Sequence, residues 1–490
     1  MTWALIAILA VPLVAVVVGA LGPWRAARAA TTVAGLVSFG LAVALGGAVE
    51  HGTVLHTAAG WLRLDALGAV FLIATGLLYA VAAVFSIGYL RGDEAGFEHF
   101  ARRYFALLNL FGWTMLLVPL AADFGTLWVA VELTTIVSAL LVAIDRTDAA
   151  LEASWKYVLI ASCGLGIALL SIIVLYAAGT AALGDSYLPR FARLQAHGAA
   201  LSPDAVRLSF VLAVVGFGTK VGFVPTHTWL PDAHSEAPAP VSALLSGALL
   251  ASALYAILRF LAVAVAAGQR SFAEHVLIVF GAASLIAAAL FVLRQRNFKR
   301  LLAYSSIEHM GLIALGVGFG APLAVAGALL HVITHASAKG LAFLGAGSLL
   351  RGYDTKEVED VVDAGRTMPW TGPMFMVAAL ALCGLPLSGV FRSEFQIVAG
   401  GFASAQYVGV ALLIVFVNLA FFGVLWHAGR MVLSPSGAAT QDPRPRERSP
   451  WMIAAMLACL AVVVVLGVHL PTALGTLLDH ARHVLFAPPA

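Results

Sequence analysis

Residues 216–234 read GFGTKVGFVPTHTWLPDAH, an apolar segment that is interrupted by glycines and prolines and carries Lys220. Proline removes a backbone donor and clashes with the preceding helical turn, so a helix that crosses a membrane here has to open near Pro225. An opened helix exposes carbonyl groups, which is tolerated at membrane depth only beside protein or a water-filled cavity. The segment therefore predicts a broken transmembrane helix next to an ion path.

A second apolar segment is interrupted in the same way. Residues 383–397 read CGLPLSGVFRSEFQI and place Glu394 beside the break. Breaks at corresponding places in two halves are typical of transporters built from inverted repeats; the alternative is two ordinary kinked helices. We expect three N-terminal helices (1–100), two inverted five-helix repeats (101–266 and 267–432), and a C-terminal transmembrane helix with a tail (433–490).

The composition predicts an all-α polytopic membrane protein. Of the 490 residues, 61% are hydrophobic and 11% are charged, whereas about a quarter of the residues of a soluble domain are charged. The apolar residues form blocks of roughly 20, long enough to cross a bilayer as helices. We expect about fourteen transmembrane helices, near residues 2–22, 29–48, 66–90, 104–120, 124–144, 154–179, 208–227, 237–265, 274–293, 301–319, 322–350, 373–399, 406–429 and 451–470.

The basic residues of the loops predict the orientation. They gather in the loops after odd-numbered spans, as do Arg294, Lys299 and Arg300, while the opposite loops hold fewer, among them Arg63 and Arg259. Cytoplasmic loops are enriched in lysine and arginine. We therefore expect a multi-pass protein of the cell (inner or plasma) membrane with both termini outside the cytoplasm. The first apolar stretch has no basic leader, which favours a first span over a cleaved signal peptide.

Several functional classes are disfavoured. The net charge of +3 and the placement of basic residues in loops argue against a nucleic-acid partner. Cys163, Cys383 and Cys459 are too far apart to suggest a disulfide framework or a cysteine metal site. The chain lacks a GxSxG elbow, a Walker loop and a GxGxxG after a strand. We predict no catalytic residues and no cofactor in this chain, so that any redox chemistry belongs to partner subunits.

Ionisable residues within or beside the spans mark a candidate ion path. A charge at the bilayer centre costs about 3 kcal/mol, so such residues usually face water or a partner; the alternative is a paired charge that locks two helices together. We expect Glu132 and Lys220 to pair, because a buried lysine keeps its proton beside a carboxylate and loses it when that carboxylate is neutralised. Glu394 is the expected terminal proton donor or acceptor. Candidate accessory residues are Lys156, His227, His234 and Glu308.

The segment HVITHASAKG places His331, His335 and Lys339 at intervals of four residues. This spacing aligns the side chains along a helical stripe of roughly 12 Å, a geometry suited to relaying protons because histidine titrates near neutrality. A zinc site and helix-packing histidines are the competing interpretations. The segment lacks the glutamate of HExxH and a third ligand, so we predict no metal. Glu308 with His309 is either a titrating pair or a structural charge.

Four segments carry a family resemblance. They resemble the antiporter-like membrane subunits shared by respiratory complex I, Mrp-type sodium/proton antiporters and membrane-bound nickel-iron hydrogenases, over about residues 100 to 430. Within this family, the segments WVAVELTTIVSA, EASWKY and EHMG are most similar to subunits of the hydrogenase-4 and formate hydrogenlyase type. The four segments are TKVGFVPTHTWLPDAHSEAPAPVSALLSG (219–247), KRLLAYSSIEHMG (299–311), HVITHASAKGLAFLGAGSLL (331–350) and GLPLSGVFRSEF (384–395).

The resemblance implies fourteen helices in two inverted repeats, with the seventh and twelfth helices broken. It implies that Glu132 and Lys220 form a gating ion pair and that Glu394 is the charged residue of the twelfth helix. It also assigns the central relay to the eleventh helix, with His331, His335 and Lys339. Ala251 departs from the pattern, because complex I relatives carry a lysine or histidine there; water or Glu308 would have to bridge the relay.

These observations lead to three functional hypotheses. The first is a proton-translocating subunit of a multi-subunit redox complex, in the bilayer with other membrane and hydrophilic subunits, of either the hydrogenase or the complex I type. The second is a stand-alone or Mrp-type cation/proton antiporter. The third is a membrane scaffold with vestigial charges. Whether the ion is a proton or sodium, and in which direction it moves, stays open.

Overall fold

The structure, a computed structural model, describes residues 2–57, 60–90, 96–185, 187–434, 446–447 and 449–486. It is helical almost throughout, as the composition predicts. The helices are α1 (Thr2–Leu21), α2 (Trp24–Val49), α3 (Ala66–Tyr89), α4 (Phe97–Leu117), η1 (Val118–Leu120), α5 (Phe124–Val142), α6 (Asp148–Leu183), α7 (Phe191–Ala196), η2 (Gly198–Ala200), α8 (Pro203–Val221), α9 (Trp229–Glu236), α10 (Ala239–Leu244), η3 (Leu245–Leu249), α11 (Leu250–Ala266), α12 (Arg270–Val292), α13 (Phe298–Gly318), α14 (Pro322–Tyr353), α15 (Ala364–Thr367), α16 (Thr371–Leu382), α17 (Gly389–Ala403), α18 (Tyr407–Leu433), α19 (Pro450–Val468) and α20 (Thr472–Phe486).

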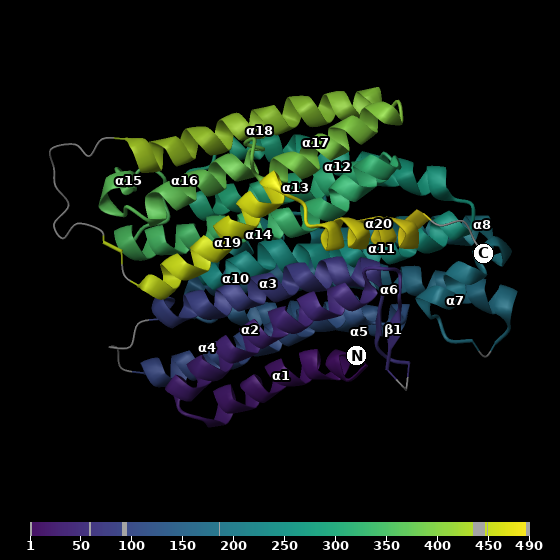
Figure 1. Ribbon diagram of the computed structural model, residues 1–490, viewed down its shortest axis with the longest axis horizontal. Coiled ribbons are helices and arrows are strands. Elements are labelled where there is room, and N and C mark those ends of the chain that lie inside the picture. Colours follow the sequence, from purple (N-terminus) through teal and green to yellow (C-terminus); the bar gives the residue numbers. More distant parts are fainter. Residues whose placement is uncertain are drawn as a thin grey trace.

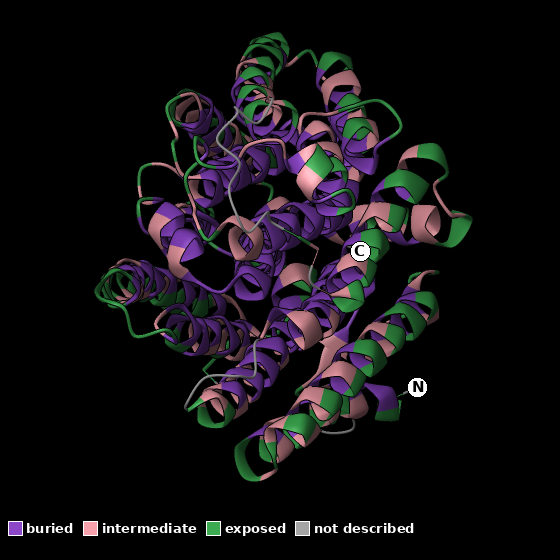
Figure 2. Ribbon diagram, turned by 90° about the vertical axis from the view of Figure 1, so that its left-hand side faces the viewer, coloured by how far each residue is buried: buried purple, intermediate pink, exposed green. Residues whose placement is uncertain are grey.

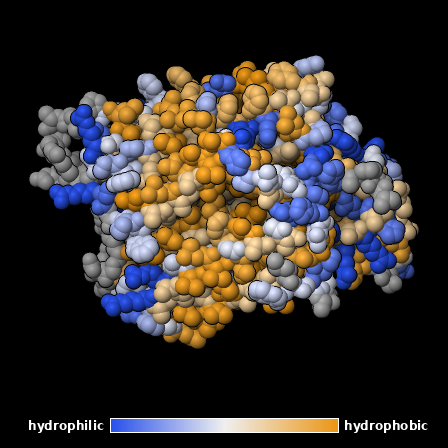
Figure 3. Space-filling model, viewed as in Figure 1, coloured by the Kyte–Doolittle hydropathy of each residue, from blue (hydrophilic) through white to orange (hydrophobic). Residues whose placement is uncertain are grey.

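The long helices run side by side along the longest axis of the molecule (Figure 1). On the face shown in Figure 3, hydrophobic residues form a band across the middle of the bundle and hydrophilic residues gather at both of its ends. Eleven helices of the described part are long and apolar enough to cross a membrane. The remaining predicted spans are those with polar residues or a break: α8, α14 and the pair α16 and α17. The chain is therefore a multi-pass membrane protein, and the count of about fourteen spans stays a prediction.

Burial separates inner from outer helices. Helices α3, α11 and α13 are buried along most or all of their length, whereas α1, α6, α18 and α19 cover the outside. In the end-on view of Figure 2, buried residues fill the middle of the bundle and exposed ones face outward. The outward side chains are themselves apolar, for example Ile173, Phe422 and Val465. Such an apolar surface suits lipid rather than water. The helices can lie inside the hydrocarbon because each satisfies its own backbone hydrogen bonds.

Both predicted helix breaks are present. Helix α8 ends at Val221, and Gly222 follows with a φ of +87°, a left-handed conformation that glycine adopts without steric cost. The chain becomes helical again at Trp229. At the second break α16 ends at Leu382, and α17 starts after Ser388, whose hydroxyl accepts from the Phe391 N–H at 3.1 Å. Each break interrupts the helical hydrogen bonding of its span.

The loops segregate to the two ends of the bundle as the span order requires. Isolated backbone β-bridges join Leu62 with Ala121 and Asp123 with Arg190. A third β-bridge joins Asn297 with Glu357. Two features were not predicted: the short antiparallel strands β1 (Leu55–His56) and β2 (Arg63–Leu64), and helix α20 in the expected tail. Helix α20 packs against α3, α11 and α14.

A buried ion pair ties the N-terminal helices to the first predicted repeat. Asp65 caps α3 and accepts two hydrogen bonds from the guanidinium of Arg259, at 2.7 and 2.8 Å. Both side chains are 2% exposed. Burial alone would raise the pKa of Asp65, but Arg259 and Arg63 together hold it well below its usual range. The prediction that Arg259 lies in a loop is therefore wrong: it belongs to α11, and its charge is matched by Asp65.

Breaking this pair is expected to destabilise the protein. Arg259→Met leaves the Asp65 carboxylate buried with the Gly68 N–H at 3.0 Å and the longer 3.3 Å contact to Arg63 as its partners, and such a loss typically costs 3 to 5 kcal/mol, about the same expected here. The measurement is the midpoint of thermal unfolding of the purified protein in detergent. Arg482→Met is the matched control, because its partner Asp479 is largely exposed and surface pairs contribute about 1 kcal/mol or less. Equal midpoints for the two variants would contradict this prediction.

Candidate functional site

The ammonium group of Lys220 is enclosed by helix α5. Its Nζ donates to the carbonyl of Val131 and the hydroxyl of Thr134, both at 2.6 Å, and to the hydroxyl of Thr135. The three acceptors share one face of α5 because residues three and four apart align on a helix. Lys220 itself is fully buried. We call these four residues the Lys220 cluster.

Glu132 does not join the Lys220 cluster in this structure. Its Oε1 accepts from the Ser162 hydroxyl of α6 at 3.0 Å, while its Oε2 is buried without a hydrogen-bond partner. Glu132 lies about 100° around the α5 helix from Val131, the residue before it. The predicted direct ion pair with Lys220 is therefore not formed: the lysine is satisfied by uncharged oxygens, and the carboxylate faces a different helix.

A line of hydroxyl groups continues from the Lys220 cluster. Ser138, one turn beyond Thr134 on α5, donates to the Thr134 carbonyl at 2.6 Å and lies 2.8 Å from the Tyr157 hydroxyl. The next residue before Tyr157 on α6 is Lys156, which is half-buried and pairs with Glu152 at 2.5 Å. Hydroxyls both donate and accept, so this line runs from the Lys220 cluster to Tyr157, whose neighbour in sequence, Lys156, belongs to a charged region near the start of α6.

That charged region is a hollow of about 250 Å³ at one end of the bundle. Asp232 of α9 lies at its centre, 2.6 Å from Arg300 and 3.6 Å from Lys156. The broken helix positions Asp232, since α9 is the short segment after the break. The hollow is lined by Ala149, Glu152, Ala153, Lys156, Asp232, Glu236 and Arg300.

The two accessory histidines lie around the first break. His234 is fully buried; its Nδ1 is 2.8 Å from the Leu230 carbonyl, while its Nε2 has no hydrogen-bond partner. Its ring lies 5.6 Å from that of Phe343 on α14. His227 is 8% exposed, and its ring packs near Phe291. Of the two, His234 lies closer to α14, which carries the predicted relay.

Lys339 occupies a site on α14 that resembles that of Lys220. Its Nζ donates to the Leu302 carbonyl of α13 at 3.0 Å and to the hydroxyl of Ser305. Lys339 is fully buried. We call Lys339, Leu302 and Ser305 the Lys339 cluster. In both clusters, uncharged oxygens of a neighbouring helix solvate the ammonium.

The predicted relay histidines meet a third histidine. The Nε2 of His331 lies 3.0 Å from the Nδ1 of His309, and its Nδ1 lies 2.8 Å from the Ser393 hydroxyl. The ring of His335 is 5.1 Å from that of His309, and neither of its nitrogens has a hydrogen-bond partner. All three histidines are fully buried. The interval of four residues on α14 brings His331 and His335 to one side, as expected, but α13 completes the group.

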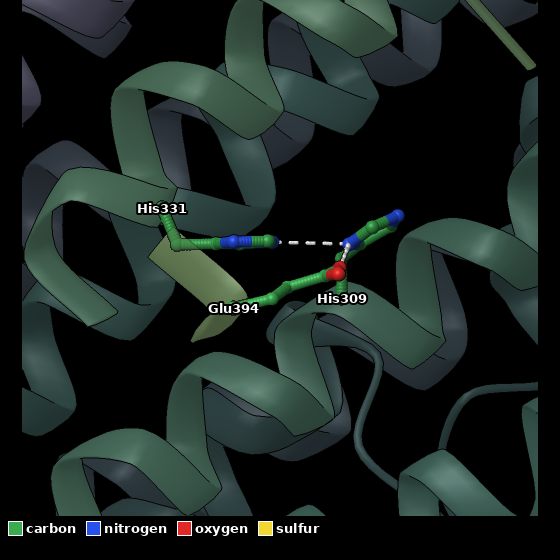
Figure 4. Close-up of side chains that lie close together, drawn as sticks. All are labelled: His309, His331 and Glu394. Carbon is green, nitrogen blue, oxygen red and sulfur yellow. Dashed lines mark hydrogen bonds and ion pairs between the residues drawn. The ribbon is translucent and has the colours of Figure 1, made fainter. Parts of the chain in front are cut away.

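Glu394 closes the histidine cluster from α17. One of its oxygens lies 4.0 Å from the Nδ1 of His309, and Figure 4 shows His309 between Glu394 and His331. Glu394 also lines a cleft of about 420 Å³ between the second break and α18, and it is the only carboxylate among the described residues that line it. We call His309, His331, His335 and Glu394 the histidine cluster.

The chemistry of this cluster favours proton sharing. His309, His331 and Glu394 each offer a ligand atom, and these atoms lie within 4.8 Å of one another. The two histidine nitrogens are already 3.0 Å apart, a hydrogen-bond distance that requires one of them to carry the proton and the other to accept it. The pair is thus arranged to hold one proton between two bases.

Two buried residues lay outside the predicted pathway. His309 was expected to form a titrating pair with Glu308 unless Glu308 is a structural charge; Glu308 is itself 4% exposed on α13. Lys299 was predicted to lie in a basic loop, but it is 1% exposed and donates to the carbonyls of Ser235 and Ala237, at 2.9 and 2.5 Å. These carbonyls end α9, and a cation is favourable at a helix C-terminus. The adjacent Glu308 and His309 in an apolar span were the available signal for His309.

Comparisons with known proteins agree on one family. Residues 121–421 match the family model described as NADH:quinone oxidoreductase/Mrp antiporter, TM. The chain is 34% identical to "Hydrogenase-4 component F homolog" of Methylacidiphilum infernorum, over 86% of this chain and 88% of the relative. It is 31% identical to "NADH-quinone oxidoreductase subunit N" of Desulforudis audaxviator, over 83% and 80%. A chain of the Mrp complex from Dietzia has the same fold, with a TM-score of 0.88 and 22% identity over 99% of this chain and 98% of that one.

Proposed function

The chain belongs to the family of NADH:quinone oxidoreductase/Mrp antiporter transmembrane proteins, and we propose that it is the proton-translocating membrane subunit of a multi-subunit redox complex. The complex is of the membrane-bound hydrogenase or complex I type. Other membrane and hydrophilic subunits carry the redox chemistry, and this chain carries protons through the bilayer.

One observation supports the proposal above the others. Fully buried titratable groups lie in successive clusters through the bundle, each solvated by hydroxyls, carbonyls or imidazoles: the Lys220 cluster, the Lys339 cluster and the histidine cluster. Ionisable groups at membrane depth are rare and usually mark an ion path. Lysine and histidine side chains take up and release protons, so the ion we propose is the proton.

Each of the two predicted repeats contributes one opening to the proposed path. The charged hollow around Asp232 leads through Tyr157 and Ser138 to Lys220. The cleft at Glu394 leads to His309 and His331. Glu132, bonded to Ser162, acts on Lys220 by approaching or leaving it, since the ammonium is surrounded by uncharged oxygens in this structure.

We further propose that residues 101–266 and 267–432 are two inverted repeats, with both termini on the non-cytoplasmic side of the cell membrane. The support is the pair of breaks after α8 and α16 and the basic residues of loops such as that containing Arg294. Cysteine labelling from either side of the membrane tests the orientation: a cysteine placed at Arg294 should react only from the cytoplasm.

The experiment that tests the function uses the native complex. The chain is purified from its own membranes through an affinity tag, and inverted membrane vesicles are given H₂ or NADH while acridine-dye quenching reports proton uptake. We expect hydrophilic redox subunits to co-purify and one of the two electron donors to drive uptake. The alternative, a stand-alone or Mrp-type antiporter, is supported by the fold shared with the Mrp complex. It predicts instead that an imposed sodium gradient drives proton movement with neither donor present.

A further inference from the structure

A segment of π-helix lies in the span that follows the first break. Residues Leu245–Leu249 form η3, in the otherwise α-helical span from α10 to α11. Single π-turns inside helices are frequent at functional sites because they displace the register of the side chains that follow. Ala251, just after η3, is buried and offers no titratable group. A path from Lys220 to Lys339 therefore needs another polar group here.

Ser246 of η3 and Ser306 of α13 provide a polar contact between the two predicted repeats. Their hydroxyl oxygens are 2.7 Å apart, and both residues are fully buried. Among the residues that the structure describes, this is the only hydrogen bond between two buried side chains that joins 101–266 to 267–432. The other side-chain pairs across this boundary, such as Arg300 with Asp232, are at least partly exposed.

On one side the hydroxyl pair and the Lys339 ammonium bind the same carbonyl oxygen. Ser306 lies 3.0 Å from the Leu302 carbonyl, and the Nζ of Lys339 donates to that same carbonyl at 3.0 Å. The hydroxyl of Ser305, which accepts a hydrogen bond from Lys339, donates to the same Leu302 carbonyl at 3.1 Å. Three donors thus converge on one oxygen atom, with the Lys339 ammonium and the Ser246–Ser306 pair on either side of it.

On the other side, α13 approaches the first break beside the Ser246–Ser306 pair. A Cβ atom added to Gly222, two residues after Lys220, would lie 3.7 Å from the side chain of Ile307, the neighbour of Ser306. A Cβ atom added to Gly247 would lie 3.0 Å from the Cα of Ala336, the neighbour of His335. The hydroxyl pair therefore lies where η3, α13 and α14 meet, and the residue that follows α8 lies near the next residue of α13.

We propose that the Ser246–Ser306 hydroxyl pair passes protons between the Lys220 cluster and the Lys339 cluster, an inference that rests on the proposed function. Each hydroxyl accepts a proton on its oxygen from one neighbour while its own proton leaves to the next. On the Lys339 side that neighbour is an internal water, because the Leu302 carbonyl shared by Ser306 and Lys339 accepts hydrogen bonds but does not carry protons. One O–H bond forms and one breaks, so both serines end unchanged. Internal water completes the connection on the Lys220 side, as bridging water does elsewhere between polar groups too far apart to bond directly.

The test compares serine variants in the assembled complex. Proton uptake is measured in inverted vesicles with whichever of H₂ and NADH drives the wild type, and assembly is checked by co-purification. Ser246→Ala and Ser306→Ala are each expected to lower uptake about tenfold or more, since a positioned proton-transfer group is lost. Ser306→Thr should restore it, because threonine keeps the hydroxyl and can bond the carbonyl one turn back.

Ser252→Ala is the matched control. Ser252 lies on α11 one turn beyond η3, and its hydroxyl bonds the Ala248 carbonyl of its own helical span at 2.8 Å; uptake should stay at the wild-type rate. The proposal is overturned if both alanine variants take up protons normally, if Ser252→Ala loses as much, or if Ser306→Thr is no better than Ser306→Ala. Lys220→Met distinguishes a failure of the serine bridge from a failure of the proposed function. If it is inactive while the serine variants are normal, only the bridge is wrong; if it is also normal, the proposed function falls as well.

Discussion

Lys220→Met is expected to reduce proton uptake at least about 100-fold while leaving the complex assembled. Methionine has nearly the length and volume of lysine, so the packing at the end of α8 is preserved. The ammonium is lost, however, and with it the group that can hold a proton beside Val131, Thr134 and Thr135. Removing a positioned acid or base commonly costs two to four orders of magnitude, roughly 100-fold at the least.

The measurement is dye quenching in inverted vesicles, together with the rate at which the electron donor is consumed. Arg430→Met is the matched control, because Arg430 lies near the bundle surface at the end of α18, with its side chain 43% exposed and 3.9 Å from Glu359. We expect that variant to take up protons normally. Normal uptake by Lys220→Met would show that the charge at Lys220 is not needed for transport. An equal loss in the control would show that the loss is not specific to Lys220.

Glu394→Gln is expected to abolish uptake to a similar extent, about 100-fold or more. Glutamine keeps the shape of the side chain but cannot take or release a proton. Among the described residues, Glu394 is the only carboxylate lining the cleft at the second break, and its oxygen lies 4.0 Å from His309. Without it, a proton held between His309 and His331 has no titratable neighbour at the cleft.

Two further variants make this prediction specific. Glu394→Asp keeps the carboxyl group and should retain part of the uptake. Glu274→Gln changes a glutamate that pairs with Arg270 at 2.7 Å near the beginning of α12, and it should leave uptake unchanged. The assignment of Glu394 to the path would be wrong if Glu394→Gln transported protons like the wild type, or if Glu394→Asp were as inactive as Glu394→Gln although the complex assembled.

Much of the fold was predictable because a bilayer restricts the solutions. Long apolar blocks with few charges have to become membrane helices, and the structure contains them in the predicted order. The breaks near Pro225 and Pro386 were predictable for a local reason, since proline cannot continue a helix. Helix α20 was missed, because its polar and apolar residues alternate around a short helix that is too polar for a span.

The candidate site was only partly predictable. Buried charges stand out in an apolar sequence, so Lys220, Lys339 and Glu394 were found from cost alone. Their partners were not, because each partner is contributed by another helix. Glu132 was expected at Lys220 but bonds Ser162, and Lys299 was expected in a loop but is buried against α9.

The multi-pass helical architecture, the positions of the helix breaks and the residues too costly to leave unpartnered in lipid could all be predicted from the amino-acid sequence. These are local properties, set by proline geometry, hydropathy and the cost of a buried charge. The meeting of particular groups became visible in the folded bundle alone: His309 with His331, Lys339 with Leu302, and Ser246 with Ser306. Such contacts depend on the rotation and depth of one helix against another, which packing of the whole bundle sets and no single segment encodes.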